Sequence, residues 1–184
     1  NLNTNLNIPA LNLSPTFGDL NGDNKEDLIL GDADGKLHLF INTGNGNFQL
    51  SSANYQNIDI GQFAYPQLID VNRDGKTDLI IGEQDGTINF LPNSGSINNA
   101  IFDTIITNWG GIDVDSSYIS NGFSAPKLIE INNEYHLFIG SYTGKTYLYN
   151  NIDGNINGIF SELNTINNNV WEGGKSSIAI QDIN

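Results

Sequence analysis

Two stretches of the chain carry oxygen-bearing side chains at the spacing of a calcium-binding loop. Each reads D-x-N-x-D-x-x-x-D, so side-chain oxygens at positions 1, 3, 5 and 9 can converge on one point when the chain curls, and the backbone carbonyl at position 7 can add another oxygen. The first loop contains Asp19, Asn21, Asp23, Lys25 and Asp27, and the second contains Asp70, Asn72, Asp74, Lys76 and Asp78. Lys25 and Lys76 would contribute only their carbonyl oxygens.

These donors are all hard oxygens, which is the ligand type that Ca²⁺ selects. Mg²⁺ is the weaker candidate because it demands a tighter octahedron and tends to retain its waters. An EF-hand is excluded, since position 12 is Leu30 or Ile81 instead of Glu and a strand follows instead of a helix. The alternative is an Asp/Asn-rich turn closed by side-chain-to-backbone hydrogen bonds. Because two equivalent copies carry three acids each, we expect two Ca²⁺ sites.

Two further copies of the motif are incomplete. In the third, Glu130, Asn132 and Glu134 keep an oxygen spacing, but the loop is two residues shorter and the last acid is missing. We interpret it as a tight hairpin through Asn132–Asn133 that has lost its metal. The fourth copy offers Asp182 and Asn184 and cannot hold a metal by itself, although it could do so if the chain continues.

The motifs belong to an internal repeat with a period near 50 residues. Four similar segments span Ser14–Gly31, Tyr65–Gly82, Ala125–Gly140 and Ser177–Asn184. Several strands per repeat of this length is typical of a propeller blade. The sequence therefore predicts an all-β fold, a β-propeller with about three four-stranded blades and partial blades at both ends. An unrelated β-sandwich with chance similarity is the alternative.

Each repeat reads as four antiparallel strands. Unbroken apolar runs predict buried central strands at Leu28–Leu30, Leu79–Ile81 and Leu137–Ile139. A weaker fourth strand is expected around Phe48–Ser51, Phe102–Ile106 and Phe160–Leu163. The predicted units are residues 1–14 (the tail of a preceding blade), 15–60, 61–120, 121–172 (the blade with the degenerate loop) and 173–184 (the start of a further blade).

The composition limits the classes of partner. The net charge is −14, from seven basic and 21 acidic residues, so nucleic acid and anionic membranes are unlikely partners. There is no cysteine, which excludes disulfides, zinc–thiolate sites and thiol nucleophiles. No apolar run reaches the ~18–20 residues that a membrane helix needs, so we expect no membrane insertion.

These motifs resemble the FG-GAP or VCBS repeat, which forms the blades of integrin-α-like β-propellers. The first copy matches best, with T-F-G-D-L-N-G-D-N-K-E-D-L-I-L-G. In the second, Leu68-Ile69 replaces the Phe-Gly pair, and the third matches in its strands but not in its loop. The resemblance implies seven or eight blades, Ca²⁺-rigidified loops and ligand recognition on one face. Three blades cannot close such a ring, so the rest would come from further sequence or a partner chain.

The resemblance and the loops favour an interaction module over an enzyme. We expect an extracellular or cell-surface protein, of bacterial type, acting in adhesion or protein–protein binding with a protein or glycan ligand. Millimolar calcium outside cells fits the weak affinity of extracellular modules, which favours a secreted or surface location. Alternatives are a component or cargo of an outer-membrane secretion or surface-motility assembly, a carbohydrate-binding or polysaccharide-lyase-type propeller, and a purely structural spacer. No nucleophile–base signature supports catalysis.

Several other side chains are also functional candidates. Sugar rings could stack on Trp109, Trp171, Tyr118, Tyr142, Tyr147 and Tyr149, although core packing is the favoured use. His38 and His136 are expected to be ordinary strand residues, and Arg73 is expected to face solvent. The insertion around residues 105–121 is a candidate recognition loop, with an ordinary connection between blades slightly favoured.

Overall fold

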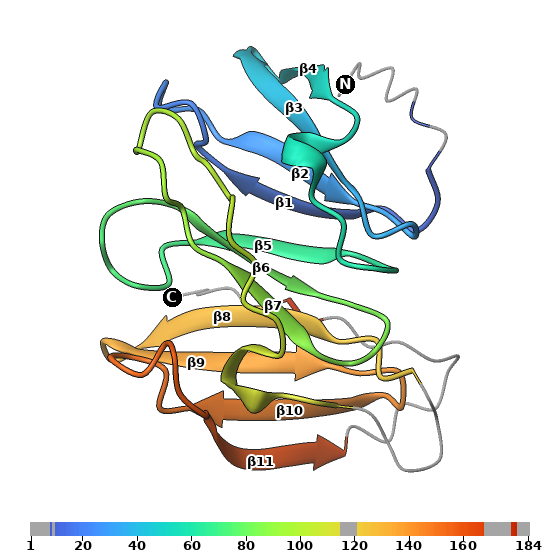
Figure 1. Ribbon diagram of the computed structural model, residues 1–184, viewed down its shortest axis with the longest axis vertical. Helices are drawn as coiled ribbons and strands as arrows, with labels where there is room; N and C mark the ends of the chain where they lie inside the picture. The colour runs from blue at the N-terminus through green and yellow to red at the C-terminus, as the bar shows by residue number, and fades with distance from the viewer. Residues whose placement is uncertain (1–7, 9, 115–120, 168–177, 180–184) are drawn as a thin grey trace.

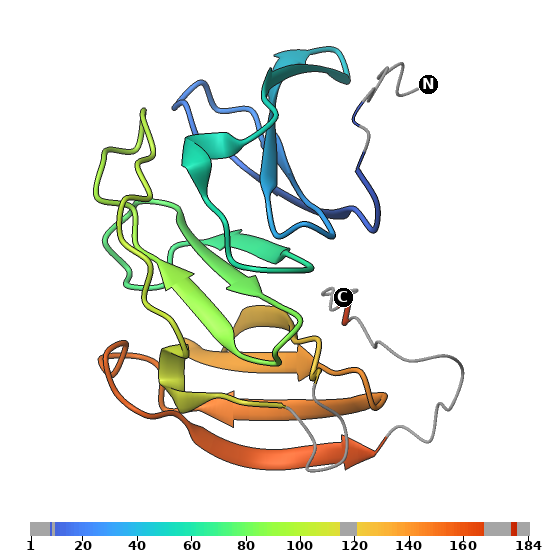
Figure 2. The ribbon, with the colours of Figure 1, turned by 45° about the vertical axis from the view of Figure 1, so that its right-hand side comes forward.

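The chain folds into three successive antiparallel sheets with almost no helix (Figure 1). The computed structural model describes residue 8 and residues 10–114, 121–167, 178 and 179. Figures 1 and 2 show the sheets following one another along the long axis, with the sheet of β5, β6 and β7 between the other two. This arrangement is consistent with the predicted propeller-type fold. None of the helices in the described part is long and apolar enough to span a membrane.

The strands follow the chain order within each sheet. The first sheet contains β1 (Ser14–Gly18), β2 (Asp27–Gly31), β3 (Leu37–Gly44) and β4 (Asn47–Ser52). The second contains β5 (Tyr65–Ile69), β6 (Asp78–Gly82) and β7 (Ile88–Leu91). The third contains β8 (Ala125–Ile131), β9 (Glu134–Gly140), β10 (Lys145–Asn150) and β11 (Ser161–Asn167). Two short 3-10 turns, η1 (Tyr55–Asn57) and η2 (Trp109–Gly111), follow the first and second sheets.

The sequence repeat is reproduced in the strand register. Ser14 pairs with Gly31 at the start of the first sheet, and Tyr65 pairs with Gly82 at the same place in the second. Ala125 pairs with Gly140 in the third sheet. The first strands β1 and β5 contact each other, as do β5 and β8, so the sheets meet along their equivalent edges.

Alternating strand residues fill two cores between the sheets. Ile29, Leu37 and Leu39 of the first sheet share one cluster with residues of the second. The second sheet places Leu79 and Ile81 in that cluster, and it directs Ile80 into the other cluster against the third sheet. Because both faces of β6 are covered, its central residues are apolar without alternation.

Two glycines allow neighbouring sheets to approach closely. A Cβ atom on Gly31 would lie 2.8 Å from Pro66 Cδ, and one on Gly82 would lie 2.6 Å from Pro126 Cδ. The same glycine and the same proline of the repeat therefore meet at both junctions. Their recurrence in the sequence reflects sheet-to-sheet contact.

The predicted fourth strands are found in the first and third sheets, as β4 and β11. The prediction of a strand at Phe102–Ile106 is wrong, because only Ile106 joins the sheet, through an isolated bridge to Phe90. Pro92 directly follows β7 and has no N–H to continue a ladder, whereas the first sheet has Ile41 at that point. Most of the predicted end units, residues 1–14 and 173–184, lies outside the described residues.

Candidate calcium loops

Both predicted loops connect the first two strands of a sheet. Asp27 begins β2 and Asp78 begins β6, and each of these side chains is fully buried. The other predicted ligand residues lie beyond the strand ends and are partly or fully exposed. The structure therefore places the ten predicted residues in two equivalent bends.

The first acid of each loop curls the chain around itself. Asp19 accepts hydrogen bonds from Gly22 N (2.7 Å) and Asn24 N (2.8 Å). Asp70 accepts them from Asp74 N (3.1 Å) and Gly75 N (2.9 Å). Positions 4 and 6 both have left-handed backbone, with φ of 75° and 61° in the first loop and 60° and 82° in the second. Glycine and asparagine tolerate this conformation, which explains three of the four residue types found there.

The amide and acid at positions 3 and 5 continue the same pattern. The Oδ1 atom of Asn21 accepts Asp23 N, and that of Asn72 accepts Asp74 N, both at 2.9 Å. Each acid at position 5 in turn accepts the N–H of the lysine that follows it. These short-range bonds hold each loop in its bend.

The last acid of each loop is buried, and no cationic side chain in the described part of the chain forms an ion pair with it. Asp27 accepts Leu20 N (3.2 Å) and Asn42 N (2.9 Å), and Asp78 accepts Val71 N (3.0 Å) and Asn93 N (2.8 Å). Burial is the main cause that raises the pKa of both carboxyl groups. The charges of Asp23 and Asp19 also raise the pKa of Asp27, as that of Asp74 does for Asp78.

The position-7 lysines partly neutralise the carboxylates at position 5. Lys25 Nζ lies 2.7 Å from Asp23 Oδ2, and this contact lowers the pKa of Asp23. Lys76 Nζ lies 3.1 Å from Asp74 Oδ2 and donates to Asn93 O at 2.6 Å. Burial raises the pKa of Asp74, but the hydrogen bonds and charge of Lys76 outweigh it and lower the pKa overall.

The loops suit calcium in three respects: their donors are oxygens, these donors follow the spacing of a calcium-binding loop, and the backbone of each loop is bent. In the described part of the chain, no three acidic or histidine side chains converge tightly enough to form a complete metal cluster. Closing around an ion therefore requires the side chains of Asp23 and Asp74 to rotate away from their lysines. Calcium binding by the ten predicted residues remains a prediction.

The third loop is the predicted hairpin. Ile131 pairs directly with Glu134, and the two turn residues, Asn132 and Asn133, have φ of 53° and 65°. Two left-handed residues in succession define the hairpin turn that matches the twist of the strands. The loss of metal here stays a prediction, and Asp182 and Asn184 lie outside the described residues.

The aromatic candidates separate into core and surface. Trp109 is 1% exposed, stacks between Phe90 and Phe160, and donates its indole N–H to Ile156 O at 2.8 Å. Tyr149 is buried in the same core and Tyr147 packs against it. Tyr142 is 37% exposed, whereas Tyr118 and Trp171 lie outside the described residues.

The other candidates have structural partners. His38 is buried with Nε2 2.7 Å from Asp32 Oδ2, and His136 Nδ1 lies 3.2 Å from Glu134 O. Arg73 is exposed, as predicted, but its guanidinium also lies over the Tyr135 ring and pairs with Asp153. Sequence alone places Arg73 in a loop but cannot show that a neighbouring sheet supplies its partners.

The segments that connect one sheet to the next along the chain form a second repeat, which was not predicted from the sequence. Y-Q-N-I-D-I (Tyr55–Ile60) and W-G-G-I-D-V (Trp109–Val114) both form a 3-10 turn followed by a one-residue bridge to the strand-2 to strand-3 turn. Ile58, Ile60, Ile112 and Val114 are buried. The described part of the 105–121 insertion is therefore an ordinary connection. The shared pattern of an aromatic residue and Ile-Asp could have revealed it.

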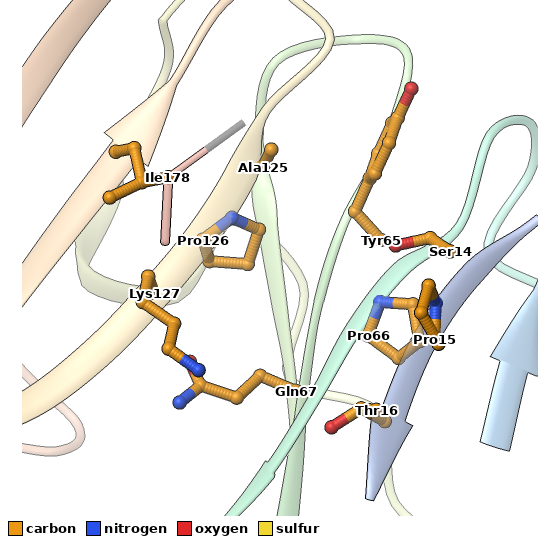
Figure 3. A pocket seen from close by; sticks show the side chains of 10 residues that line it. All are labelled: Ser14, Pro15, Thr16, Tyr65, Pro66, Gln67, Ala125, Pro126, Lys127 and Ile178. Carbon is orange, nitrogen blue, oxygen red and sulfur yellow. The ribbon is translucent and has the colours of Figure 1, made fainter. Parts of the chain in front are cut away.

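The first strands of the three sheets also line one pocket of about 250 Å³ (Figure 3). Pro15, Pro66 and Pro126 occupy equivalent positions in β1, β5 and β8. The next residues along, Thr16, Gln67 and Lys127, lie beside them in the pocket. Equivalent residues from three sheets thus face one common space, as expected where blades meet near an axis.

Comparison with known proteins supports the repeat. Residues 19–81 match the family model described as an FG-GAP-like repeat, so this part of the chain carries such a repeat. The match runs from the first acid of the first loop to β6, and it includes both predicted calcium loops. None of the curated proteins compared with the chain matches it.

Proposed function

We propose that this chain is part of a calcium-stabilised β-propeller interaction module of a secreted or cell-surface protein. It acts in adhesion or protein–protein binding, with a protein or glycan as its ligand, and is not an enzyme in its own right. The observation that carries the proposal is the pair of equivalent acidic bends within an FG-GAP-like repeat. The remaining blades come from further sequence or from a partner chain.

Calcium would act here as a structural element. The neighbouring acids raise the pKa of the last carboxyl group of each bend, so a divalent cation would reverse an unfavourable interaction. Binding to the folded state alone stabilises it by mass action. Millimolar extracellular calcium is sufficient for loops of modest affinity, which supports a secreted or surface location.

The ligand would bind to the loops that connect the strands, because the rigid strands hold these loops in place. A component or cargo of an outer-membrane secretion or surface-motility assembly is one form of the same proposal. Carbohydrate binding is the second candidate function, and Tyr142 favours it. Its ring is 37% exposed and lies 5.4 Å from that of Phe123 at an interplanar angle of 32°, so it presents an aromatic surface to a sugar.

Calorimetric titration of the full chain with calcium tests the metal sites. We expect two sites in the wild type and one site in each of Asp23→Ala and Asp74→Ala. These side chains are the least buried of the predicted ligand acids in their loops, so the substitutions should leave the fold intact. Asp34→Ala, an exposed acid outside the loops, is the matched control and should retain both sites. Absence of calcium binding by the wild type would contradict the proposal.

A further inference from the structure

Arg73 extends from the second loop to the third sheet. Its Nε donates to Asp153 Oδ1 at 2.7 Å, its Nη2 donates to Asn133 O at 3.2 Å, and its Nη1 lies 3.4 Å from Glu130 Oε1. The guanidinium carbon lies 4.2 Å from the centre of the Tyr135 ring. A side chain from the middle of the loop thus has four partners, all in the next repeat.

A second connection joins the same two elements. The hydroxyl of Tyr135 donates to the carbonyl oxygen of Asp70, the first loop residue, at 2.6 Å. The backbone N–H of Tyr135 donates to Asp153 Oδ2 at 2.6 Å. Asp153 therefore holds both Arg73 and the strand on which Tyr135 lies, and Tyr135 holds the start of the loop.

We propose that Arg73 is a positioning residue that couples calcium binding in the second loop to the docking of the third sheet. The inference rests on the proposed function, because it assumes that the loop binds calcium. Asp153 and Glu130 draw the guanidinium away from the loop acids, so that it does not compete with an ion for their oxygens. Tyr135 fixes the backbone at position 1.

Electrostatics explains why the tether matters. Arg73 lies between Asn72 and Asp74, so its guanidinium can reach the carboxylates that would bind calcium. A free guanidinium there would pair with carboxylate oxygens and compete with the cation. Loss of Asp153 should therefore harm the site more than loss of Arg73, because it releases a competing cation as well as a tether.

The first loop provides an internal comparison. The residue equivalent to Arg73 is Gly22, and a Cβ atom built there would lie 2.9 Å from Asn98 Cα of the second sheet's loop. The neighbouring backbone thus fills the space that Arg73 spans in the second loop. Binding of calcium to the first loop should be independent of the third sheet.

The experiment is a calcium titration of the full chain followed by two-dimensional NMR. The amide signal of Gly75 reports the second loop and that of Gly22 reports the first. We expect Asp153→Asn to weaken binding at Gly75 about tenfold or more, within the range seen when a supporting residue of a metal site is lost. The midpoint at Gly22 should not change. The double variant Arg73→Gln/Asp153→Asn should bind more tightly at Gly75 than Asp153→Asn alone.

The outcomes separate the two proposals. If the wild type shows no calcium response at either glycine, the proposed function fails. If both loops respond but Asp153→Asn leaves the Gly75 midpoint unchanged, or if the double variant shows no recovery, only the coupling is overturned. Arg73→Gln, which removes the tether without releasing a cation, provides the same comparison should Asp153→Asn not fold, and an unchanged Gly75 midpoint would then contradict the coupling.

Discussion

The side-chain amide of Gln67 pairs with both backbone polar groups of Leu128 in the next sheet. Its Oε1 accepts Leu128 N at 2.7 Å, and its Nε2 donates to Leu128 O at 2.9 Å. One repeat earlier, Thr16 Oγ1 accepts the N–H of Leu68 at 3.0 Å. A polar side chain at the same position of β1 and β5 thus satisfies the free edge of the following first strand.

Replacing Gln67 with leucine should destabilise the fold strongly. The volume is nearly preserved, but a buried N–H and a buried C=O of Leu128 lose their partners. At about 1–3 kcal/mol for each unsatisfied group, we expect a loss of about 2–6 kcal/mol in the free energy of unfolding, measured by urea denaturation. The same replacement at exposed Gln49 is the control and should change it by less than about 0.5 kcal/mol. Equal effects at the two positions would contradict this role of Gln67.

Gly82→Ala should also be strongly destabilising. The added Cβ would lie 2.1 Å from Ser124 O and 2.6 Å from Pro126 Cδ, so two sheets would have to separate. We expect a loss of about 3 kcal/mol or more in thermal or urea unfolding. Gly46→Ala is the control, because no atom lies within 4 Å of its Cβ position and only the left-handed φ of 73° costs about 1–2 kcal/mol.

Trp109 should behave as a core residue and not as a sugar platform. In a Trp171→Phe background its fluorescence should be blue-shifted, resistant to iodide quenching and unchanged by added glycans. Trp109→Ala should cost about 3–5 kcal/mol, since the indole packs between two aromatic rings and its N–H is bonded. Ready quenching by iodide in the folded protein would show that the ring is accessible.

Alkaline pH should weaken the fold through buried tyrosines. Burial, followed by the charge of Glu162, raises the pKa of Tyr149 from 10.0 to about 12. Tyr149 therefore keeps its hydroxyl proton to a higher pH in the folded state than in the unfolded chain. The contribution of Tyr149 to the free energy of unfolding is complete below the unfolded pKa and is lost as pH rises from about 10 to about 12. Urea midpoints should fall across this range and fall less steeply for Tyr149→Phe, whereas parallel profiles would exclude the effect.

The repeat allowed the strands to be predicted because each copy repeats the same burial pattern. Leu28–Leu30, Leu79–Ile81 and Leu137–Ile139 align in register, and the shortened third loop forms a two-residue hairpin as expected. The second sheet lacks the predicted fourth strand, and there Pro92 stands where the first copy of the repeat has Ile41. Local chemistry at one position outweighed the pattern of the other copies.

The residues of the candidate site could be predicted from the sequence, but the residues that surround them could not. The acids of both loops were identifiable because metal-binding residues are close in sequence. Asp153 lies 80 residues from Arg73 and Leu128 lies 61 residues from Gln67, and no local pattern encodes such contacts. The lysine contacts of Asp23 and Asp74 were also not predicted, because the loop motif assigns Lys25 and Lys76 a role only through their carbonyl groups.

Thermal unfolding of the full chain, in excess chelator and then in millimolar calcium, tests the central claim most directly. Two loops that bind only in the folded state should raise the melting temperature by several degrees, and Asp23→Ala with Asp74→Ala should abolish the rise. Magnesium at the same concentration should have a smaller effect. A melting temperature that is identical with chelator and with calcium would contradict the assignment of both loops.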